Sequence, residues 1–127
     1  MSDRVSSELA LLRRAHPELE FLDEEFWVRL PAYAMPAGWS EPEVELAFRI
    51  PPTAAVQPYG FWVHPGVTLA DGRQPTNYTQ SVEIPFGPGW GQFSWSPQIW
   101  RPHAVIEKGD NMLHFLRSIT DRLGDLA

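Results

Sequence analysis

A polar segment over residues 69–81 holds most of the side chains that could carry acyl-transfer chemistry. Its hydroxyl and amide groups include those of Thr76, Asn77, Tyr78, Thr79 and Ser81. A hydroxyl can act as a nucleophile, and an Asn amide or a backbone N–H can stabilise the oxyanion that forms. The same composition also fits a polar surface loop whose side chains satisfy their own backbone. The residues alone leave both interpretations open.

A hydroxyl nucleophile needs a base within hydrogen-bonding reach, and three histidines are candidates for that base. His64 precedes the polar segment, whereas His103 and His114 follow it. The spacing does not decide which imidazole ring lies close to a hydroxyl.

Other chemistries have less support in the sequence. The chain has no Cys, which excludes disulfides, zinc–thiolate sites and a thiol nucleophile within it. Its four His lack metal-motif spacing, and the glycine-rich run 87–91 lacks the Lys and Ser or Thr of a phosphate-binding loop. The acidic runs 23–25 and 41–45 indicate a turn and a solvated strand face. We therefore expect neither a metal nor a cofactor.

Length and composition predict one folded domain over residues 1–127. The hydrophobic fraction of 43% favours a packed core over disorder. The net charge of −6 argues against nonspecific binding to nucleic acid or to anionic membranes. No apolar run is long enough to span a membrane, and the first residues lack a signal-peptide pattern. We expect a cytoplasmic protein that binds neither nucleic acid nor membrane.

Two amphipathic helices are expected to flank a sheet. Residues 2–16 and residues 110–126 each have apolar side chains at helical spacing. Four short strands are expected between the helices, over residues 19–22, 26–30, 44–50 and 59–63, and residues 81–85 are a further candidate for a short strand. Residues 67–80 are expected to form a long irregular loop, and loops of this length are often functional. This order predicts an α+β two-layer fold with a four-stranded antiparallel meander.

Residues 89–102 contain half of the six tryptophans, together with several Gly and Pro. Each indole ring needs a large buried area and a partner for its N–H. The segment is therefore expected to be a rigid, non-repetitive wall behind the polar loop, and a support for the site rather than its chemistry.

Several short motifs occur in an order that is typical of one protein family. They are LPAYAMPAGW at residues 30–39, LAFRIPP at 46–52, GFWVHPGV at 60–67 with Asp71-Gly72 after it, GWGQFS at 89–94, WSP at 95–97, WRP at 100–102 and LHFL at 113–116. With these motifs the chain resembles a prokaryotic branch of the ubiquitin-conjugating enzyme (UBC) superfamily, from about residue 18 to residue 126.

The resemblance implies a fold and a function. The fold would be UBC-like, with an N-terminal helix, a four-stranded meander, an active-site loop and a C-terminal helix. The function would be to accept a ubiquitin-like protein from an activating enzyme and pass it to an amine or another target in the bacterial cytoplasm. The implied partners are therefore the activating enzyme and the ubiquitin-like protein.

One departure from the family changes the chemistry. Conjugating enzymes carry their cargo as a thioester on Cys, and the family pattern places that Cys near residues 75–78, where this chain has none. The Ser-Arg-His pattern of the branch reads Ser94-Trp95-Ser96 here, so its histidine is missing as well. Thioester transfer on this chain is thereby excluded.

Three functions stay open after that departure. In the first, the cargo forms an oxyester on a Ser, Thr or Tyr hydroxyl. The residues assigned to that reaction are Thr76, Tyr78, Thr79 and Ser81 as candidate nucleophiles, Asn77 as oxyanion donor, and His64 or His114 as base. In the second, the chain is an inactive scaffold that binds the activating enzyme or the ubiquitin-like protein. In the third, it is an unrelated α+β domain with an undefined ligand.

Overall fold

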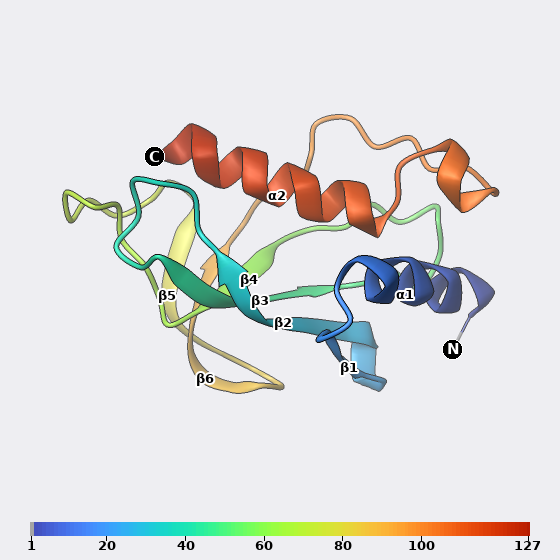
Figure 1. The fold of residues 1–127 in the computed structure, drawn as a ribbon, viewed down its shortest axis with the longest axis horizontal. Helices are drawn as coiled ribbons and strands as arrows, with labels where there is room; N and C mark the ends of the chain where they lie inside the picture. Colours follow the sequence, from blue (N-terminus) through green and yellow to red (C-terminus); the bar gives the residue numbers. More distant parts are fainter. Residues whose placement is uncertain (1) are drawn as a thin grey trace.

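The computed structural model describes residues 2–127. One helix lies near each end of the chain, and the strands of a sheet lie between them in the sequence (Figure 1). Helix α1 spans Asp3–Ala15 and helix α2 spans Met112–Leu126. Two short 3-10 turns, η1 and η2, cover Glu24–Phe26 and Ile106–Lys108. The predicted placement of the two helices is confirmed.

Helix α1 begins and ends where its sequence indicates. The Ser2 hydroxyl accepts a hydrogen bond from the Val5 N–H at 3.2 Å, which satisfies one of the free donors of the first turn. Val5 and Leu12 face the core and are fully buried. The helix stops because His16 precedes Pro17 and adopts a φ of −134°, outside the helical region.

The sheet has six strands rather than the four expected from the sequence, and every pair of neighbours is antiparallel. The strands are β1 (Glu20–Leu22), β2 (Trp27–Ala34), β3 (Glu43–Arg49), β4 (Phe61–His64), β5 (Tyr78–Ile84) and β6 (Gly87–Phe93). Their order across the sheet is β1-β2-β3-β4-β6-β5. The α+β class is confirmed, and the count of four strands is wrong.

The two additional strands come from segments that were expected to be mostly irregular, and only the second half of β5 overlaps the strand candidate at residues 81–85. Strand β5 is mostly polar and exposed, and β6 contains Pro88 and three glycines, so neither shows the alternation that predicts a strand. The strand form of β6 depends on its pairing with β4, in which Phe93 lies opposite Phe61 and Gly91 lies opposite Val63.

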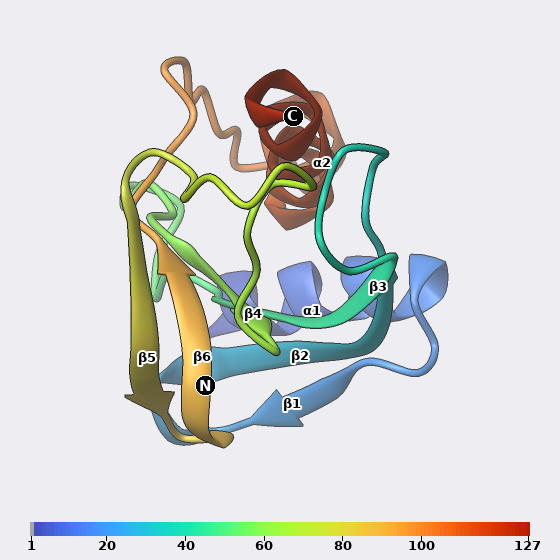
Figure 2. The ribbon, with the colours of Figure 1, turned by 90° about the vertical axis from the view of Figure 1, so that its left-hand side faces the viewer.

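Both faces of the sheet bury apolar side chains. Figure 1 shows the two helices on the same side of the sheet, where they cover the larger cluster, which includes Val28, Leu46, Phe48, Phe61 and Phe115. The opposite, helix-free face carries a second cluster, made of Trp27, Ala47, Trp62, Ile84 and Trp90. Figure 2 shows β5 and β6 running at a steep angle to β1 and β2.

The turn between β5 and β6 closes over the helix-free face. The ring of Phe86 lies 6.4 Å from that of Trp27 and 6.2 Å from that of Trp90. The Arg29 guanidinium lies 4.7 Å from the centre of the Phe86 ring, a cation–π contact. The hairpin is therefore fixed at its tip as well as along β4.

The tryptophan-rich segment is only partly the non-repetitive wall that its composition predicts. Its first part is strand β6, in which Trp90 is buried on the helix-free face. The part that follows is irregular and packs on α2, where the rings of Trp95 and Trp100 each lie 6.4 Å from that of Phe115.

Helix α2 is fixed at both ends by polar contacts. At its start, Asn111 accepts a hydrogen bond from the His114 N–H at 3.0 Å. Near its end, the Trp39 indole N–H donates to the Leu123 carbonyl at 3.0 Å. Along residues 2–127, no helix is both long and apolar enough to cross a membrane.

Glu8 is a buried carboxylate that joins the two helices. It accepts a hydrogen bond from the Met112 N–H at 2.9 Å and lies 3.3 Å from Arg4. Burial raises the pKa of the Glu8 carboxyl, and the Met112 N–H and Arg4 offset only part of that rise. The native state therefore binds this proton more tightly than the unfolded state does.

Glu8→Gln should change how stability depends on pH. Because the native pKa is raised, the contribution of Glu8 to stability falls as pH rises from the ordinary glutamate pKa through the native one. Urea unfolding between about pH 4 and pH 7 should show wild type losing stability relative to the variant as pH rises. Glu107→Gln, at an exposed glutamate, is the control. If the free energy of unfolding of wild type instead rose relative to that of Glu8→Gln as pH increases, the raised pKa of Glu8 would be contradicted.

Candidate functional site

Residues 65–77, termed the connecting loop, leave β4 and return to the sheet at β5. The loop is held by its backbone. The Ala70 N–H donates to the Gly38 carbonyl at 2.8 Å, and Leu69 forms an isolated bridge with Trp39. Since Trp39 also contacts the end of α2, the loop is anchored to both layers of the fold.

The sharp turn of the connecting loop closes on itself at Asp71, as its Asp-Gly sequence predicts. The Asp71 carboxylate accepts a hydrogen bond from the Arg73 N–H at 3.0 Å and one from the Arg73 guanidinium at 2.7 Å. These bonds, the backbone one first, lower the pKa of the Asp71 carboxyl. The turn is therefore a local structure, and its carboxylate is engaged by its own loop.

Tyr78 fastens the start of the connecting loop to β5. Its hydroxyl accepts a hydrogen bond from the Val67 N–H at 2.9 Å and donates to Gln80 at 2.5 Å. A Cβ on Gly91 would lie 1.9 Å from the Tyr78 oxygen, and one on Gly66 would lie 2.0 Å from the Gln80 amide. Burial raises the pKa of the Tyr78 phenol. This hydroxyl is therefore engaged and held protonated.

The other hydroxyl and amide candidates lie on the surface around β5. Thr76 and Asn77 end the connecting loop, Thr79 pairs with Gln92 in the sheet, and all three candidates are exposed. Ser81 is exposed in an irregularity between two paired positions of β5. Asn77 and Ser81 have φ values of 53° and 64°, in the left-handed region that few non-glycine residues adopt. Such irregularities redirect side chains and are common beside sites.

His64 ends β4 on the helix-free face. Its Nδ1 lies 3.0 Å from a carboxylate oxygen of Glu45, whose other oxygen lies 3.3 Å from the Arg29 guanidinium. Arg29 also pairs with Glu20, so a line of four charged or titratable groups crosses β1 to β4. The imidazole ring lies 5.2 Å from the Trp90 ring, and its side chain is 40% exposed.

Sequence reasoning missed Glu45 as the partner of His64. It assigned Glu45 to a solvated strand face, but the register of β3 and β4 places the two residues opposite each other. The alternation of β3 was a usable signal, because it puts Glu45 on the face away from the helices. What the sequence did not give was which strand lies beside β3 and in what register.

His114 lies in the first turn of α2, with its Nδ1 3.3 Å from Asp110. The other Asp110 oxygen accepts a hydrogen bond from the Arg101 N–H at 2.7 Å. His103 is engaged differently, since its Nδ1 accepts a hydrogen bond from the Val105 N–H at 2.9 Å. Each of these rings is therefore held by a neighbour on its own segment.

The structure brings Tyr78 and Gln80 to the connecting loop but separates the two predicted bases. His64 lies on the helix-free face, whereas His114 belongs to α2, which covers the opposite face. Within residues 2–127, no imidazole forms a hydrogen bond with the hydroxyls of Thr76, Thr79 or Ser81. In the same part of the chain, no group of three or more His, Asp or Glu side chains could hold a metal ion.

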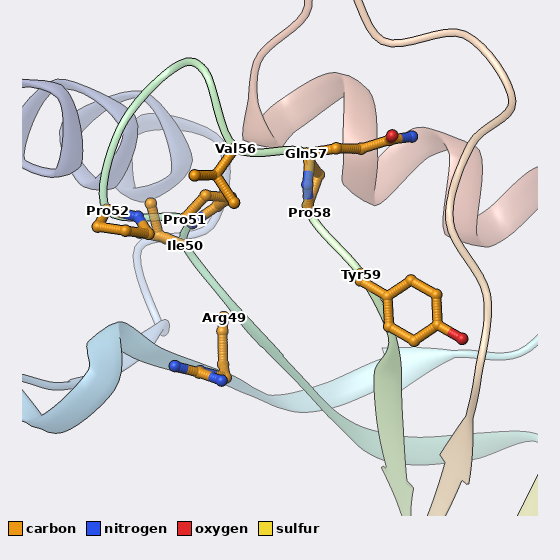
Figure 3. Close-up of a pocket in the computed structure, with 8 residues that line it drawn as sticks. All are labelled: Arg49, Ile50, Pro51, Pro52, Val56, Gln57, Pro58 and Tyr59. Carbon is orange, nitrogen blue, oxygen red and sulfur yellow. The ribbon is translucent and has the colours of Figure 1, made fainter.

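An exposed apolar patch lies at the other end of β4 from the connecting loop. It consists of Val56, Tyr59 and Ile99, whose exposed fractions are 47%, 62% and 66%. The patch borders a shallow pocket lined by Arg49, Ile50, Pro51, Pro52, Val56, Gln57, Pro58 and Tyr59 (Figure 3). Gln57 donates to the Pro97 carbonyl at 2.5 Å, so the segment leading to Ile99 lies beside the pocket.

The chain matches the model of a known protein family. The family model described as prokaryotic E2 family E matches residues 10–125. No curated protein and no solved structure matches the chain.

Tyr78→Phe should loosen the connecting loop. The change removes the acceptor for the Val67 N–H, and losing one hydrogen bond of this kind costs about 1 kcal/mol. Hydrogen exchange at the Val67 amide should become faster, and the free energy of unfolding should fall by that amount. Tyr59→Phe is the matched control, because Tyr59 is exposed and its hydroxyl has no hydrogen bond within the described residues. Unchanged protection of the Val67 amide in Tyr78→Phe would show that the Tyr78 hydroxyl does not hold the connecting loop.

Proposed function

Since the chain belongs to prokaryotic E2 family E, we propose that it binds a ubiquitin-like protein and its activating enzyme and positions the activated C-terminus of that protein for transfer. The family match over residues 10–125 carries this proposal, because it covers nearly the whole chain. The proposal places the chain in a conjugation reaction without making it a thioester carrier.

The absence of Cys supports a positioning role. A thioester cannot form on these 127 residues, which contain no thiol. A Ser, Thr or Tyr hydroxyl would need an adjacent base to act as a nucleophile. The hydroxyls of Thr76, Thr79 and Ser81 have no imidazole in contact, and the Tyr78 hydroxyl is bonded to Val67 and Gln80.

The apolar patch supports binding to a partner protein. Val56, Tyr59 and Ile99 expose large apolar side chains on two segments that the Gln57–Pro97 hydrogen bond joins, whereas most other large apolar side chains are buried. Clustered exposed apolar residues favour protein–protein contact. We therefore expect the patch to contact the activating enzyme or the ubiquitin-like protein.

An oxyester carrier is the second candidate function. It is favoured by the left-handed backbone of Asn77 and Ser81, which sets two polar side chains at an exposed edge of the sheet. In this version Ser81, Thr76 or Thr79 carries the cargo, Asn77 stabilises the oxyanion, and His64 or His114 approaches as base only when a partner is bound.

One reaction distinguishes the two candidates. The chain is incubated with its activating enzyme, ATP and the ubiquitin-like protein, and the products are separated under denaturing conditions with thiol reductant. The positioning role predicts a complex in the native mixture and no lasting adduct on the denaturing gel. An adduct that resists reductant and is cleaved by hydroxylamine would establish the oxyester carrier instead. Failure to form any complex would overturn both.

Substitutions in the apolar patch should weaken the complex. Tyr59→Ser combined with Ile99→Ser removes exposed apolar area without touching the core, so the fold should be retained. Dissociation constants should rise by about tenfold or more, because two contact residues of this size each contribute about 1 kcal/mol or more. Val105→Ser is the control, because Val105 is 46% exposed outside the patch. Equal affinities for the patch variant and the control would exclude the patch as contact surface.

A further inference from the structure

We propose that His64 is a covalent acyl acceptor, whose Nε2 takes up an activated acyl group and passes it to an amine. The inference rests on the proposed function, because the natural acyl group would be the C-terminus of the positioned ubiquitin-like protein. It goes beyond that function, since it makes the chain a transient carrier that needs neither a thiol nor a hydroxyl.

The nucleophiles of this chain differ in what they need in order to react. Ser, Thr and Tyr hydroxyls are weak nucleophiles until a base removes their proton. A neutral imidazole already carries a free lone pair on one of its nitrogens and needs no second group. In a chain without Cys, a histidine with that nitrogen open to solvent is therefore the simplest covalent nucleophile.

The contacts of His64 fix which nitrogen is free. Its Nδ1 lies 3.0 Å from the Glu45 carboxylate, which accepts hydrogen bonds and donates none when ionised. This close contact with a carboxylate favours the tautomer of the neutral ring with the proton on Nδ1 and the lone pair on Nε2. Arg29 holds Glu45 in turn, at 3.3 Å, so the carboxylate is oriented from both sides.

Within the described residues, the Nε2 atom of the ring is unpaired and not fully buried, since it has no hydrogen-bond partner and is not among the buried unpaired polar atoms. It faces Gly89, where an added Cβ would lie 3.5 Å from Nε2. Gly89 has a φ of +85°, and because it has no side chain, this residue places only backbone atoms beside Nε2. The Trp90 ring closes the other side, at 5.2 Å.

The position of His64 in the fold suits acyl transfer. It is the last residue of β4, directly before the connecting loop that begins at Pro65. The apolar patch lies at the opposite end of this four-residue strand. A partner seated on the patch could therefore lay an extended C-terminal tail along the sheet toward His64, because a strand of this length spans only about 13 Å.

The other histidines lack part of this arrangement. His103 accepts a hydrogen bond at Nδ1, so the proton of its neutral ring is on Nε2. His16 lies 3.5 Å from Glu18, beyond a good hydrogen bond. His114 is the closest match, with the same 40% exposure and a hydrogen bond between Nδ1 and Asp110 at 3.3 Å, but it lies on the helix side of the sheet. His16, which neither candidate function uses, serves as the control.

The step balances without any further reagent. The Nε2 lone pair attacks the carbonyl carbon of an activated thioester, the Nε2–C bond forms, the C–S bond breaks, and the thiolate leaves with its electron pair. The ring becomes a cationic acyl-imidazole, which the Glu45 carboxylate stabilises. An amine then attacks the same carbon, its N–C bond forms, the C–N bond to the ring breaks, and the amine loses a proton to solvent. Neutral His64 is regenerated.

The test uses the full chain and p-nitrophenyl acetate, a small activated ester. Attack should release p-nitrophenolate and leave one acetyl group on His64, found by mass spectrometry after rapid acid quenching and removed by hydroxylamine. His64→Gln should slow this release by at least about tenfold, since it removes the nucleophile itself. His16→Gln should react at the wild-type rate. Equal rates for wild type and His64→Gln, or an acetyl group found on another residue, would overturn the proposal.

Glu45 acts through His64 as a positioning residue, and nitrogen NMR tests that role separately. The His64 imidazole should carry its proton on Nδ1 in wild type and in Glu45→Gln, where an amide oxygen can still lie beside Nδ1. In Glu45→Ala that preference should be lost and acetylation should be slower. The same tautomer in all three proteins would contradict the role of Glu45. Loss of acetylation in His64→Gln with partner binding intact separates this inference from the proposed function.

Discussion

The pairing of β4 with β6 is the contact on which the rest of the molecule depends. It places Phe93 against Phe61 and Gly91 against Val63, and so returns the chain to the centre of the sheet after the connecting loop. Without it, the hairpin of β5 and β6 would be detached from the rest of the sheet, and the connecting loop would have only one end fixed to the sheet. The same pairing puts Trp90 beside the His64 ring and Gly89 next to Nε2. One stretch of backbone hydrogen bonds thus closes the core and shapes the candidate site.

The spacing of apolar residues along the sequence predicted those helices and strands that form one buried face. The stripe that includes Val5 and Leu12 and the alternation of Val44, Leu46 and Phe48 gave both the helix and the strand correctly. Strand β6 could not be found in this way, because a run with Pro88 and three glycines forms a strand only through its neighbour. The contact of Glu45 with His64 was hidden for a similar reason, since register brings them together. Conversely, the placement of Thr76, Thr79 and Ser81 on the surface agrees with the alternative of a polar segment that carries no chemistry.

The charged groups of the site divide between the two faces of the sheet. On the helix-free face, Glu45 and Arg29 organise His64 at the end of β4. On the helical side, Asp110 holds His114 and the buried Glu8 ties the start of α2 to α1. These contacts on the helical side stabilise the fold, and this explains the presence of their charged groups. On the helix-free face, His64 stands at the end of β4 with Nε2 unpaired within residues 2–127, and none of its contacts there joins the two layers of the fold, which is why we assign chemistry to it.

Strand β4 therefore has the apolar patch at one end and the His64 imidazole at the other, and these two features carry the proposed function. Titration of the 15N-labelled chain with its ubiquitin-like protein, followed by NMR, tests this directly. The account predicts that amide shifts change around Val56 and Tyr59 at one end and around His64 and Gly89 at the other. Shifts confined to the outer surfaces of α1 and α2, or no binding at all, would contradict it.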